Sequence, residues 1–391
     1  MQVPLLIIYY ISGFFLRDPV LWLFGGWNGK HFRGNSKQLF LFVRNHCPDI
    51  SAVWITKNRK LADQLIKGGF PAYYVYSLGG IWKTLRGKYF IVTHGIGDIN
   101  EFVSRGGIMI NLSHSIYPIK DMSFAGTVTF LRKIYFHMRE PLRYFIKPDY
   151  AITASEFTAP ATVHHYNISS NRVLPLGTPK TDFLLAPDSD PILFHAAEYA
   201  KFYGSRTKKI LFLPTWRKDH GFSIFNFGFD PVGLDTLLKE IDAAIAFSFH
   251  PFTAMYQKIP DLSGFERLMC FHDSGDEMNY LLGKADMLIT DYSALFADYL
   301  IYNKPIIFAK FDHDSYIRAN PLYADYDHLP GPKAESWPEL LDYIREIFVF
   351  GRDDYKSRRE MMRDLIYPRT DGRACERIVQ FIMSLCPQKN V

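Results

Sequence analysis

The stretch DMLITDYSALFADYLIYNKPIIFAKF (286–311) places an amphipathic segment between two short apolar runs. The runs 286–293 and 305–311 have the length and composition of buried strands, and residues 294–303 between them are typical of a helix. A strand, a helix and another strand in this order predict a parallel unit in which the helix covers one face of a sheet.

The same alternation continues on the N-terminal side of this stretch. We expect further strands at 51–57, 89–94, 107–114, 150–155, 172–177, 209–216, 244–251 and 267–273. A polar segment at 186–209 interrupts the alternation, and helices close the chain. We therefore predict an α/β fold of two Rossmann-like doubly wound domains that face a cleft, with ligands bound at the carboxyl ends of the strands.

The expected divisions of the chain are a membrane-interface segment at 1–28, an N-terminal domain at 29–185 and a C-terminal domain at 186–391. The run MQVPLLIIYYISGFFL (1–16) is apolar, but Arg17 and Asp18 interrupt it before the ~20 residues that a spanning helix needs. We interpret residues 1–28 as a buried or interfacial anchor, with a plain core helix as the alternative.

A second candidate for membrane contact is the segment TFLRKIYFHMREPLRYFIK (129–147). It interleaves aromatic side chains with five basic ones, namely Arg132, Lys133, Arg139, Arg143 and Lys147. This composition suits an anionic lipid surface. The alternative is an ordinary amphipathic helix with a solvated basic face.

The overall composition excludes several classes of protein. Of the 391 residues, 48% are hydrophobic and 22% are charged, which excludes a disordered chain. The net charge of +5 is too small to indicate a nucleic-acid partner, so we expect none. The four cysteines, Cys47, Cys270, Cys375 and Cys386, stand far apart without a CxxC pair, so we predict neither a zinc site nor a disulfide framework.

Two nucleotide-binding fingerprints are missing from the sequence. No GxGxxG follows an early strand, and no GxxxxGK[ST] occurs. A dinucleotide-dependent dehydrogenase and a P-loop protein therefore lack their main signal.

Polar residues instead end several of the predicted strands. They are His114 and Ser115, Thr215 and Arg217, His250, and Asp291 and Ser293. Because the carboxyl ends of parallel strands meet at one edge of a sheet, these positions predict a phosphate-rich ligand, with N–H groups offered by the helix after Ser293. Each residue also has a purely structural interpretation: a hydrogen-bonded histidine, a helix cap at Ser293 or a surface ion pair at Arg217.

The sequence resembles the CDP-glycerol glycerophosphotransferase family, which makes teichoic acids and related capsule polymers. The resemblance lies in NLSHSIYPIKDM (111–122), LGTPKTDFLL (176–185), LFLPTWR (211–217), FSFHP (247–251) and LITDYSALFADYLIYNKPIIF (288–308). The segments 29–58 and GRACERIV (372–379) extend it to nearly the whole chain.

This resemblance implies a GT-B type fold and assigns roles to individual residues. His114 would be the general base and His250 would contact the phosphates, with Lys180 as a point charge. The candidate substrate-binding residues are Ser115, Lys180, Pro214, Thr215, Arg217, Ser248, Asp291, Ser293, Ala294 and Asp298.

The chain departs from the family pattern at a few of these positions. Ser113 and Ser115 stand where the family has the Trp and Gly of a WHG motif, Lys180 replaces an arginine, and Ala294 replaces a serine. The change to Lys180 keeps the charge but loses bidentate phosphate geometry.

The reaction that the resemblance implies is transfer of glycerol phosphate, or a related alditol phosphate, from a CDP-activated donor to a hydroxyl group, with release of CMP. The donor would bind the C-terminal domain. The acceptor would be a polyprenyl-linked saccharide at the cytoplasmic side of the cell membrane, to which the enzyme would bind peripherally. We expect no required cofactor and no protein metal site, and we leave Mg²⁺ open.

Two other interpretations stay open. One is a GT-B glycosyltransferase that uses a nucleotide sugar, for which DSGDE (273–277) is only a faint version of the expected glutamate-rich motif. The other is a non-catalytic membrane-associated scaffold of the same fold. The choice between glycerol and ribitol, between primase and polymerase, and the oligomeric state are not set by the sequence.

Overall fold

The computed structural model describes residues 3–114, 117, 119, 142, 146–186, 196–215, 217, 222–249, 259–272 and 277–385. The chain divides into two compact units. Unit 1 comprises residues 1–116, 123–183 and 369–391, and unit 2 comprises residues 117–122 and 184–368.

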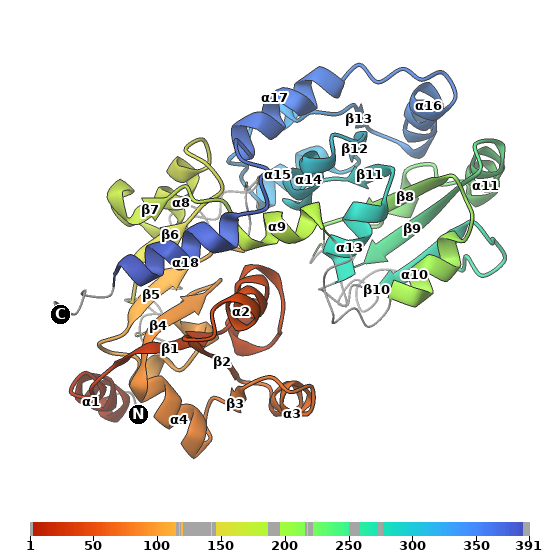
Figure 1. Cartoon of the computed structure of the whole chain (residues 1–391). Helices are drawn as coiled ribbons and strands as arrows, with labels where there is room; N and C mark the ends of the chain where they lie inside the picture. The colour runs from red at the N-terminus through yellow and green to blue at the C-terminus, as the bar shows by residue number, and fades with distance from the viewer. Residues whose placement is uncertain are drawn as a thin grey trace. The chain divides into compact units, whose positions relative to one another are not determined.

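Unit 1 contains a seven-stranded parallel sheet in the order β3-β2-β1-β4-β5-β6-β7 (Figure 1). Its strands are β1 (Asp18–Phe24), β2 (Ser51–Thr56), β3 (Ala72–Tyr74), β4 (Gly87–Val92), β5 (Ile108–Asn111), β6 (Tyr150–Ile152) and β7 (Val173–Leu174). The strand order reverses between β1 and β4, which is the point where doubly wound sheets bind ligands.

The described helices of unit 1 connect and flank these strands. They are α1 (Val3–Ser12), α2 (Gly34–His46), α3 (Arg59–Lys67), α4 (Leu78–Arg86), α8 (Ala159–Tyr166), α9 (Pro179–Leu185), which runs into unit 2, and α18 (Ala374–Ser384). Short 3-10 turns occur at η1 (Trp27–Gly29), η2 (Ile96–Asp98), η3 (Glu101–Val103) and η4 (Ser170–Arg172).

Strand β1 corrects the predicted interface segment at 1–28. Its residues 21–24 are buried, because β2 pairs with one edge of the strand and β4 with the other. An apolar run between two parallel strands is covered on both faces of the sheet, so it belongs to the core. The predicted boundary at residue 28 is therefore wrong, and the exposed large apolar side chains of the segment 1–28 all precede residue 21.

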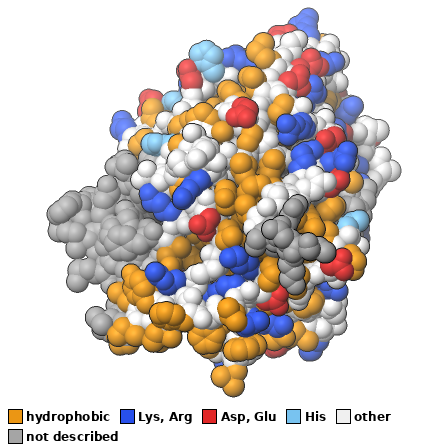
Figure 2. Space-filling view, turned by 60° about the vertical axis from the view of Figure 1, so that its left-hand side comes forward, with side chains coloured by type: hydrophobic (Ala, Val, Ile, Leu, Met, Phe, Trp, Pro, Cys, Tyr) orange, Lys and Arg blue, Asp and Glu red, His pale blue; other side chains and the backbone are white. Residues whose placement is uncertain are grey.

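The residues before β1 expose apolar side chains. Ile7, Tyr10, Ile11, Phe14 and Leu16 are each more than half exposed. Figure 2 shows hydrophobic side chains gathered at the lower end of the face in view, at the height where α1 and α4 lie in Figure 1. No helix in the described part of the chain combines the length and the apolar character that crossing a bilayer requires.

Unit 2 contains a six-stranded parallel sheet in the order β10-β9-β8-β11-β12-β13. Its strands are β8 (Lys208–Leu213), β9 (Ala243–Phe249), β10 (Leu268–His272), β11 (Met287–Thr290), β12 (Ile306–Ala309) and β13 (Lys333–Ala334). This order reverses between β8 and β11, so the second unit has the same kind of switch point as the first.

The described helices of unit 2 are α10 (Ala196–Tyr203), α11 (Pro231–Glu240), α13 (Glu277–Lys284), α14 (Leu295–Tyr299), α15 (His313–Ala319), α16 (Trp337–Phe348) and α17 (Lys356–Ile366). The 3-10 turns are η6 (Ile224–Asn226), η7 (Leu300–Tyr302) and η8 (Tyr326–His328). Two Rossmann-like α/β units confirm the predicted fold class.

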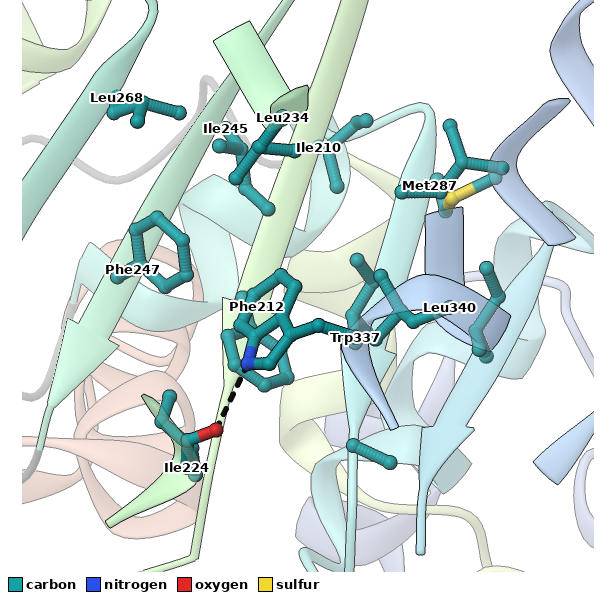
Figure 3. Close-up of a cluster of buried hydrophobic side chains, with 14 of the residues drawn as sticks. Ile210, Phe212, Ile224, Leu234, Ile245, Phe247, Leu268, Met287, Trp337 and Leu340 are labelled. Atoms are coloured by element: carbon teal, nitrogen blue, oxygen red, sulfur yellow. Dashed lines mark hydrogen bonds between the residues drawn. The ribbon is translucent and has the colours of Figure 1, made fainter. Parts of the chain in front are cut away.

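The core of unit 2 is built around Trp337 at the start of α16 (Figure 3). Its ring packs with Phe212 and Phe247 of the sheet, and it is 1% exposed. A buried indole N–H needs an acceptor, and here it donates to the carbonyl of Ile224 at 2.8 Å. This contact attaches α16 and the η6 turn to the same face of the sheet.

The predicted bounds of the C-terminal domain, 186–391, are wrong at their end, because helix α18 belongs to the first unit. The first backbone N–H groups of α18, those of Ala374 and Cys375, donate to the carboxylate of Asp182 at 3.0 and 2.8 Å. A carboxylate at a helix N-terminus satisfies donors that have no partner inside the helix. Arg377 also donates to the carbonyl of Leu176, so α18 belongs to unit 1.

Candidate active site

In unit 1, the neighbouring strands β1, β4 and β5 each end in a turn that carries an aromatic ring. Trp27 follows β1, His94 follows β4 and His114 follows β5. The imidazole rings of His94 and His114 stack, with centroids 4.5 Å apart and planes at 18°. The switch point of unit 1 therefore carries a pair of histidines.

The carboxylate of Asp98 joins the turns after β1 and β4. It accepts hydrogen bonds from the backbone N–H groups of Thr93 at 2.7 Å, His94 at 2.9 Å and Asn28 at 2.6 Å. Asp98 is fully buried, and hydrogen bonds to an ionised carboxylate are among the stronger ones in proteins. The backbone that carries His94 is consequently held in one position.

The turn that carries His114 is held by Asn111, the last residue of β5. The Asn111 Oδ1 atom accepts hydrogen bonds from the N–H of Ser113 at 2.8 Å and from the hydroxyl of Tyr166 at 2.9 Å. Ser113 has a positive φ of 56°, which a non-glycine residue adopts only when its surroundings require it. The turn after β5 is therefore shaped by side-chain contacts.

Asn35 in α2 holds the same turn from the other side. Its Nδ2 group donates to the carbonyls of Leu112 at 2.9 Å and Ser113 at 2.8 Å, and its Oδ1 accepts from the N–H of Lys180 at 2.9 Å. A buried asparagine with donors and acceptor all engaged is a rigid connector. It links α2, the His114 turn and the start of α9.

Burial is the main cause that keeps both rings of the histidine pair neutral. The pKa of His114 is lowered to about 3, mainly by burial and to a smaller extent by the nearby ionisable groups of His94, His165 and Lys180. Burial also lowers the pKa of His94, an effect that Asp98 opposes and Arg33 reinforces. At neutral pH both imidazoles are unprotonated and can accept a proton.

The structure thus brings together two of the predicted residues of unit 1, His114 and Lys180. Ser115 lies outside the described residues. Sequence reasoning missed His94, although the signal was available: it ends the predicted strand 89–94, the neighbour of 107–114. It also missed Asp98 and Asn35, which no local pattern distinguishes from ordinary polar residues.

In unit 2, the predicted residues at the ends of β8 and β11 bind each other. The Thr215 N–H donates to both carboxylate oxygens of Asp291, at 2.8 and 3.0 Å, and its hydroxyl donates to Oδ1 at 2.6 Å. Pro214, also predicted to bind substrate, lies in the partly buried segment between β8 and this contact. These bonds fix the chain on both sides of the switch point of unit 2.

Arg217 lies between two buried carboxylates. It pairs with Asp291 at 2.9 Å and, through Nε and Nη2, with both oxygens of Asp312 at 2.8 and 2.9 Å. Its guanidinium also lies 4.3 Å from the ring centroid of Tyr316. Burial acts to lower the pKa of Arg217, but the two carboxylates outweigh burial and raise it above its ordinary value.

The alternative interpretation of Arg217 as half of a surface ion pair is wrong. Its ion pair with Asp291 is buried, since Arg217 is 6% exposed and Asp291 is 2% exposed. A buried arginine that engages two carboxylates is a structural connector whose removal leaves buried charge unpaired. The expected substrate contacts of Arg217 and Asp291 are untested and stay predictions.

The other predicted residues of unit 2 have mixed surroundings. The Ser293 hydroxyl accepts from the N–H of Leu295 at 3.3 Å, and Ala294 is the N-cap residue of the short helix α14, without a side-chain cap bond. Asp298 is buried within α14. Ser248 in β9 is 4% exposed, and its hydroxyl makes no hydrogen bond with the described residues. His250 lies outside the described residues.

The described part of the chain contains no group of three or more His, Cys, Asp or Glu side chains that could hold a metal ion. Three cysteines, Cys47, Cys270 and Cys375, are described and are free thiols. The second candidate membrane segment, 129–147, lies almost entirely outside the described residues.

Two Rossmann-like units, each with polar side chains gathered at the switch point of its sheet, define an α/β protein of the GT-B fold type. A sequence profile of the CDP-glycerol:poly(glycerophosphate) glycerophosphotransferase family matches residues 8–384. The chain belongs to this family.

Similar proteins agree with this assignment. The teichoic acid poly(ribitol-phosphate) polymerase of Bacillus spizizenii is 30% identical over 239 residues, which are 59% of this chain and 37% of that polymerase. The teichoic acid poly(glycerol phosphate) polymerase of Staphylococcus epidermidis is 25% identical over 325 residues, or 80% of this chain and 44% of that polymerase. The chain thus spans less than half the length of these curated relatives.

The fold also matches a solved structure. The wall teichoic acid polymerase TagF superposes with a TM-score of 0.73 at 22% sequence identity. The match covers 94% of this chain and 89% of that chain. At this identity the likeness concerns the fold alone.

Proposed function

We propose that this protein transfers glycerol phosphate, or a related alditol phosphate, from its CDP-activated form to a hydroxyl group of an acceptor. Membership of the glycerophosphotransferase family supports this reaction, as do the names of the relatives, which are polymerases of glycerol phosphate and ribitol phosphate. The observation that carries the proposal is the neutral imidazole of His114, held on a fixed turn at the switch point of unit 1.

In the proposed step, the acceptor oxygen attacks the phosphorus atom that carries the alditol. A new P–O bond forms, the bond to the bridging oxygen breaks, and CMP leaves with that oxygen. The hydroxyl proton goes to the neutral ring of His114, since an unprotonated imidazole is an effective general base. The anionic donor would raise the pKa of His114 from its low value, because a nearby negative charge favours the protonated form.

Other residues would bind the donor and balance its charge. Lys180 would face the phosphates as a point charge, and His250 would offset the charge that develops on the bridging oxygen. The bonds among Thr215, Asp291 and Arg217 support a donor site at the switch point of unit 2 by fixing its backbone. Ser115, Pro214, Ser248, Ser293, Ala294 and Asp298 stay candidate substrate contacts.

We further propose that the acceptor is a saccharide linked to a polyprenyl lipid, and that the protein binds the cytoplasmic side of the membrane peripherally. The exposed apolar side chains of residues 7–16 support this location, as do Leu78 and Trp82 of α4, which are 90% and 55% exposed. Arg105 lies 4.3 Å from the ring centroid of Tyr10 and supplies positive charge beside the apolar group. Such a surface suits an anionic lipid interface.

The reaction is tested by incubating the protein with CDP-glycerol, CDP-ribitol or UDP-sugars, each with a lipid-linked saccharide acceptor, and measuring released CMP or UDP. Release of CMP from a CDP-alditol is expected, with or without a chelator of Mg²⁺. Release of UDP alone would contradict the proposal and indicate a glycosyltransferase. Release of neither CMP nor UDP would indicate a non-catalytic scaffold.

Membrane binding has its own test, flotation with anionic liposomes. The double variant Ile11→Ser and Phe14→Ser should float less than the wild type. A matched control is Met361→Ser in α17, since Met361 is 67% exposed but lies in unit 2. Equal flotation of all three proteins would refute the proposed surface.

A further inference from the structure

The histidine pair of unit 1 is part of a longer row of flat side chains in contact. The guanidinium carbon of Arg33 lies 3.5 Å from the ring centroid of Trp27, and the Trp27 ring lies 5.1 Å from the ring of His94. His94 in turn stacks on His114 at 4.5 Å. The four side chains come from three segments of unit 1, since Trp27 and Arg33 share the connection between β1 and α2, and His94 is stacked directly on the proposed base.

His94 is restrained more tightly than a surface histidine would be. Its backbone N–H donates to the buried carboxylate of Asp98, and its Nδ1 lies 3.1 Å from the hydroxyl of Thr93. Trp27 contacts its ring, and so does His114. A ring held through its backbone, its edge and its faces can fix the plane of a ring stacked on it.

Burial and the neighbouring ionisable groups together set the charge state of the pair. Besides burial, His94, His165 and Lys180 lower the pKa of His114, while Asp98 raises and Arg33 lowers the pKa of His94. Two imidazoles 4.5 Å apart repel each other when both are positively charged, so at most one of the two rings is an imidazolium near neutral pH. The charge state of one ring therefore depends on the other.

We propose that His94 is a positioning residue for the transfer reaction: its stacked imidazole orients the ring of His114 and disfavours protonation of His114 before the acceptor hydroxyl is bound. This inference rests on the proposed function, in which His114 takes the hydroxyl proton. The observations that support the inference are the stacking of His94 on His114 and the hydrogen bond from the His94 N–H to the buried carboxylate of Asp98.

Three variants separate orientation from charge. His94→Phe keeps a flat ring on His114 but removes the ionisable group, and His94→Ala removes both. The matched control is His46→Phe: His46 is an exposed histidine of α2 that stacks on Phe42 at 4.5 Å and 23°, but it is not in the site. Circular dichroism melting shows whether each variant folds.

The first readout is the pH titration of the His114 ring Cε1–H signal by NMR, which needs no substrate. In His94→Phe the titration midpoint should rise by about half a pH unit or more, because one positive group has been removed. In His94→Ala the signal should also move through loss of the ring stacked above it, whereas His46→Phe should leave it unchanged. An unchanged signal and midpoint in both His94 variants would overturn the inference.

The second readout is the rate of CMP release against pH. His94→Ala should lower kcat about tenfold with little change in the KM for the donor, because a misoriented base affects the chemical step. His94→Phe should keep kcat within about threefold while its acidic limb moves to higher pH, since the base is now protonated more easily. Wild-type kcat and pH profiles in both variants would refute a positioning role.

The two readouts also separate this inference from the proposed function. If the wild type releases no CMP from any CDP-alditol, the proposed function fails, and so does any role of His94 in the transfer. The NMR titration then still decides whether His94 controls the charge of His114. If the wild type is active and both His94 variants match it, only the inference fails.

Discussion

The switch points of the two units have the same topology but opposite uses of charge. In unit 1, the stacked imidazoles stay neutral, mainly because they are buried. In unit 2, the two carboxylates of Asp291 and Asp312 are matched by the guanidinium of Arg217. A neutral imidazole can accept a proton, whereas paired buried charges hold the chain in place. The comparison supports the proposed proton transfer in unit 1 and shows backbone support in unit 2.

The largest effect expected from this comparison is on the activity of His114→Ala. Loss of a general base should lower kcat by about 10²–10⁴-fold, and the variant should still fold. The measurement is CMP release from the active CDP-alditol, together with thermal melting. His46→Ala is the matched control, and activity near the wild-type level in His114→Ala would remove the catalytic assignment.

The counterpart in unit 2 is a loss of stability in Arg217→Ala. Removing this arginine leaves two buried carboxylates without their partner, which should lower the free energy of unfolding by about 3–5 kcal/mol. Urea denaturation measures it. Arg352→Ala is the control, because Arg352 and its partner Glu346 are both exposed and should matter little. Equal stability of the two variants would show that the buried pairs are not structural.

A smaller effect is expected for Asn35→Ala in unit 1. The change leaves the carbonyls of Leu112 and Ser113 without a donor, which should cost about 1–3 kcal/mol of unfolding free energy. Because the freed turn carries His114, kcat should fall more than the affinity for donor. Thermal melts and CMP release measure the two effects, and a stable, fully active variant would contradict the proposed connector.

The smallest expected effect is the change with pH of the stability that the His114 ring contributes to unit 1. The pKa of His114 in the folded chain, about 3, lies below the ~6.5 of an unfolded histidine, so the unfolded chain binds more protons between these values. The stability that the neutral ring contributes is present above pH ~6.5 and is lost as the pH falls toward 3. Urea denaturation at pH 7, 6 and 5 measures this loss. The free energy of unfolding should depend less on pH in His114→Phe than in His46→Phe. Equal slopes of this free energy against pH in the two variants would contradict the expectation.

Most strands of both sheets could be predicted from the sequence, because short apolar runs that alternate with amphipathic segments are typical of buried strands in an α/β fold. Strand β1 was missed since its apolar run continues the apolar N-terminus, and composition does not distinguish a buried strand from an interfacial segment. Strand β3 was missed because three residues make no pattern. The position of α18 in unit 1 depends on Asp182, which is far away in the sequence.

The sequence by itself determined the α/β alternation, the presence of polar residues at the strand ends and the membership of the family. The tertiary structure decided which strand ends are neighbours: β4 beside β5 brings His94 onto His114, and β8 beside β11 brings Thr215 onto Asp291. The physical reason is that strand order follows from long-range pairing and burial. A local pattern shows that a histidine ends a strand, but its pKa and its stacking partner depend on residues contributed by other segments.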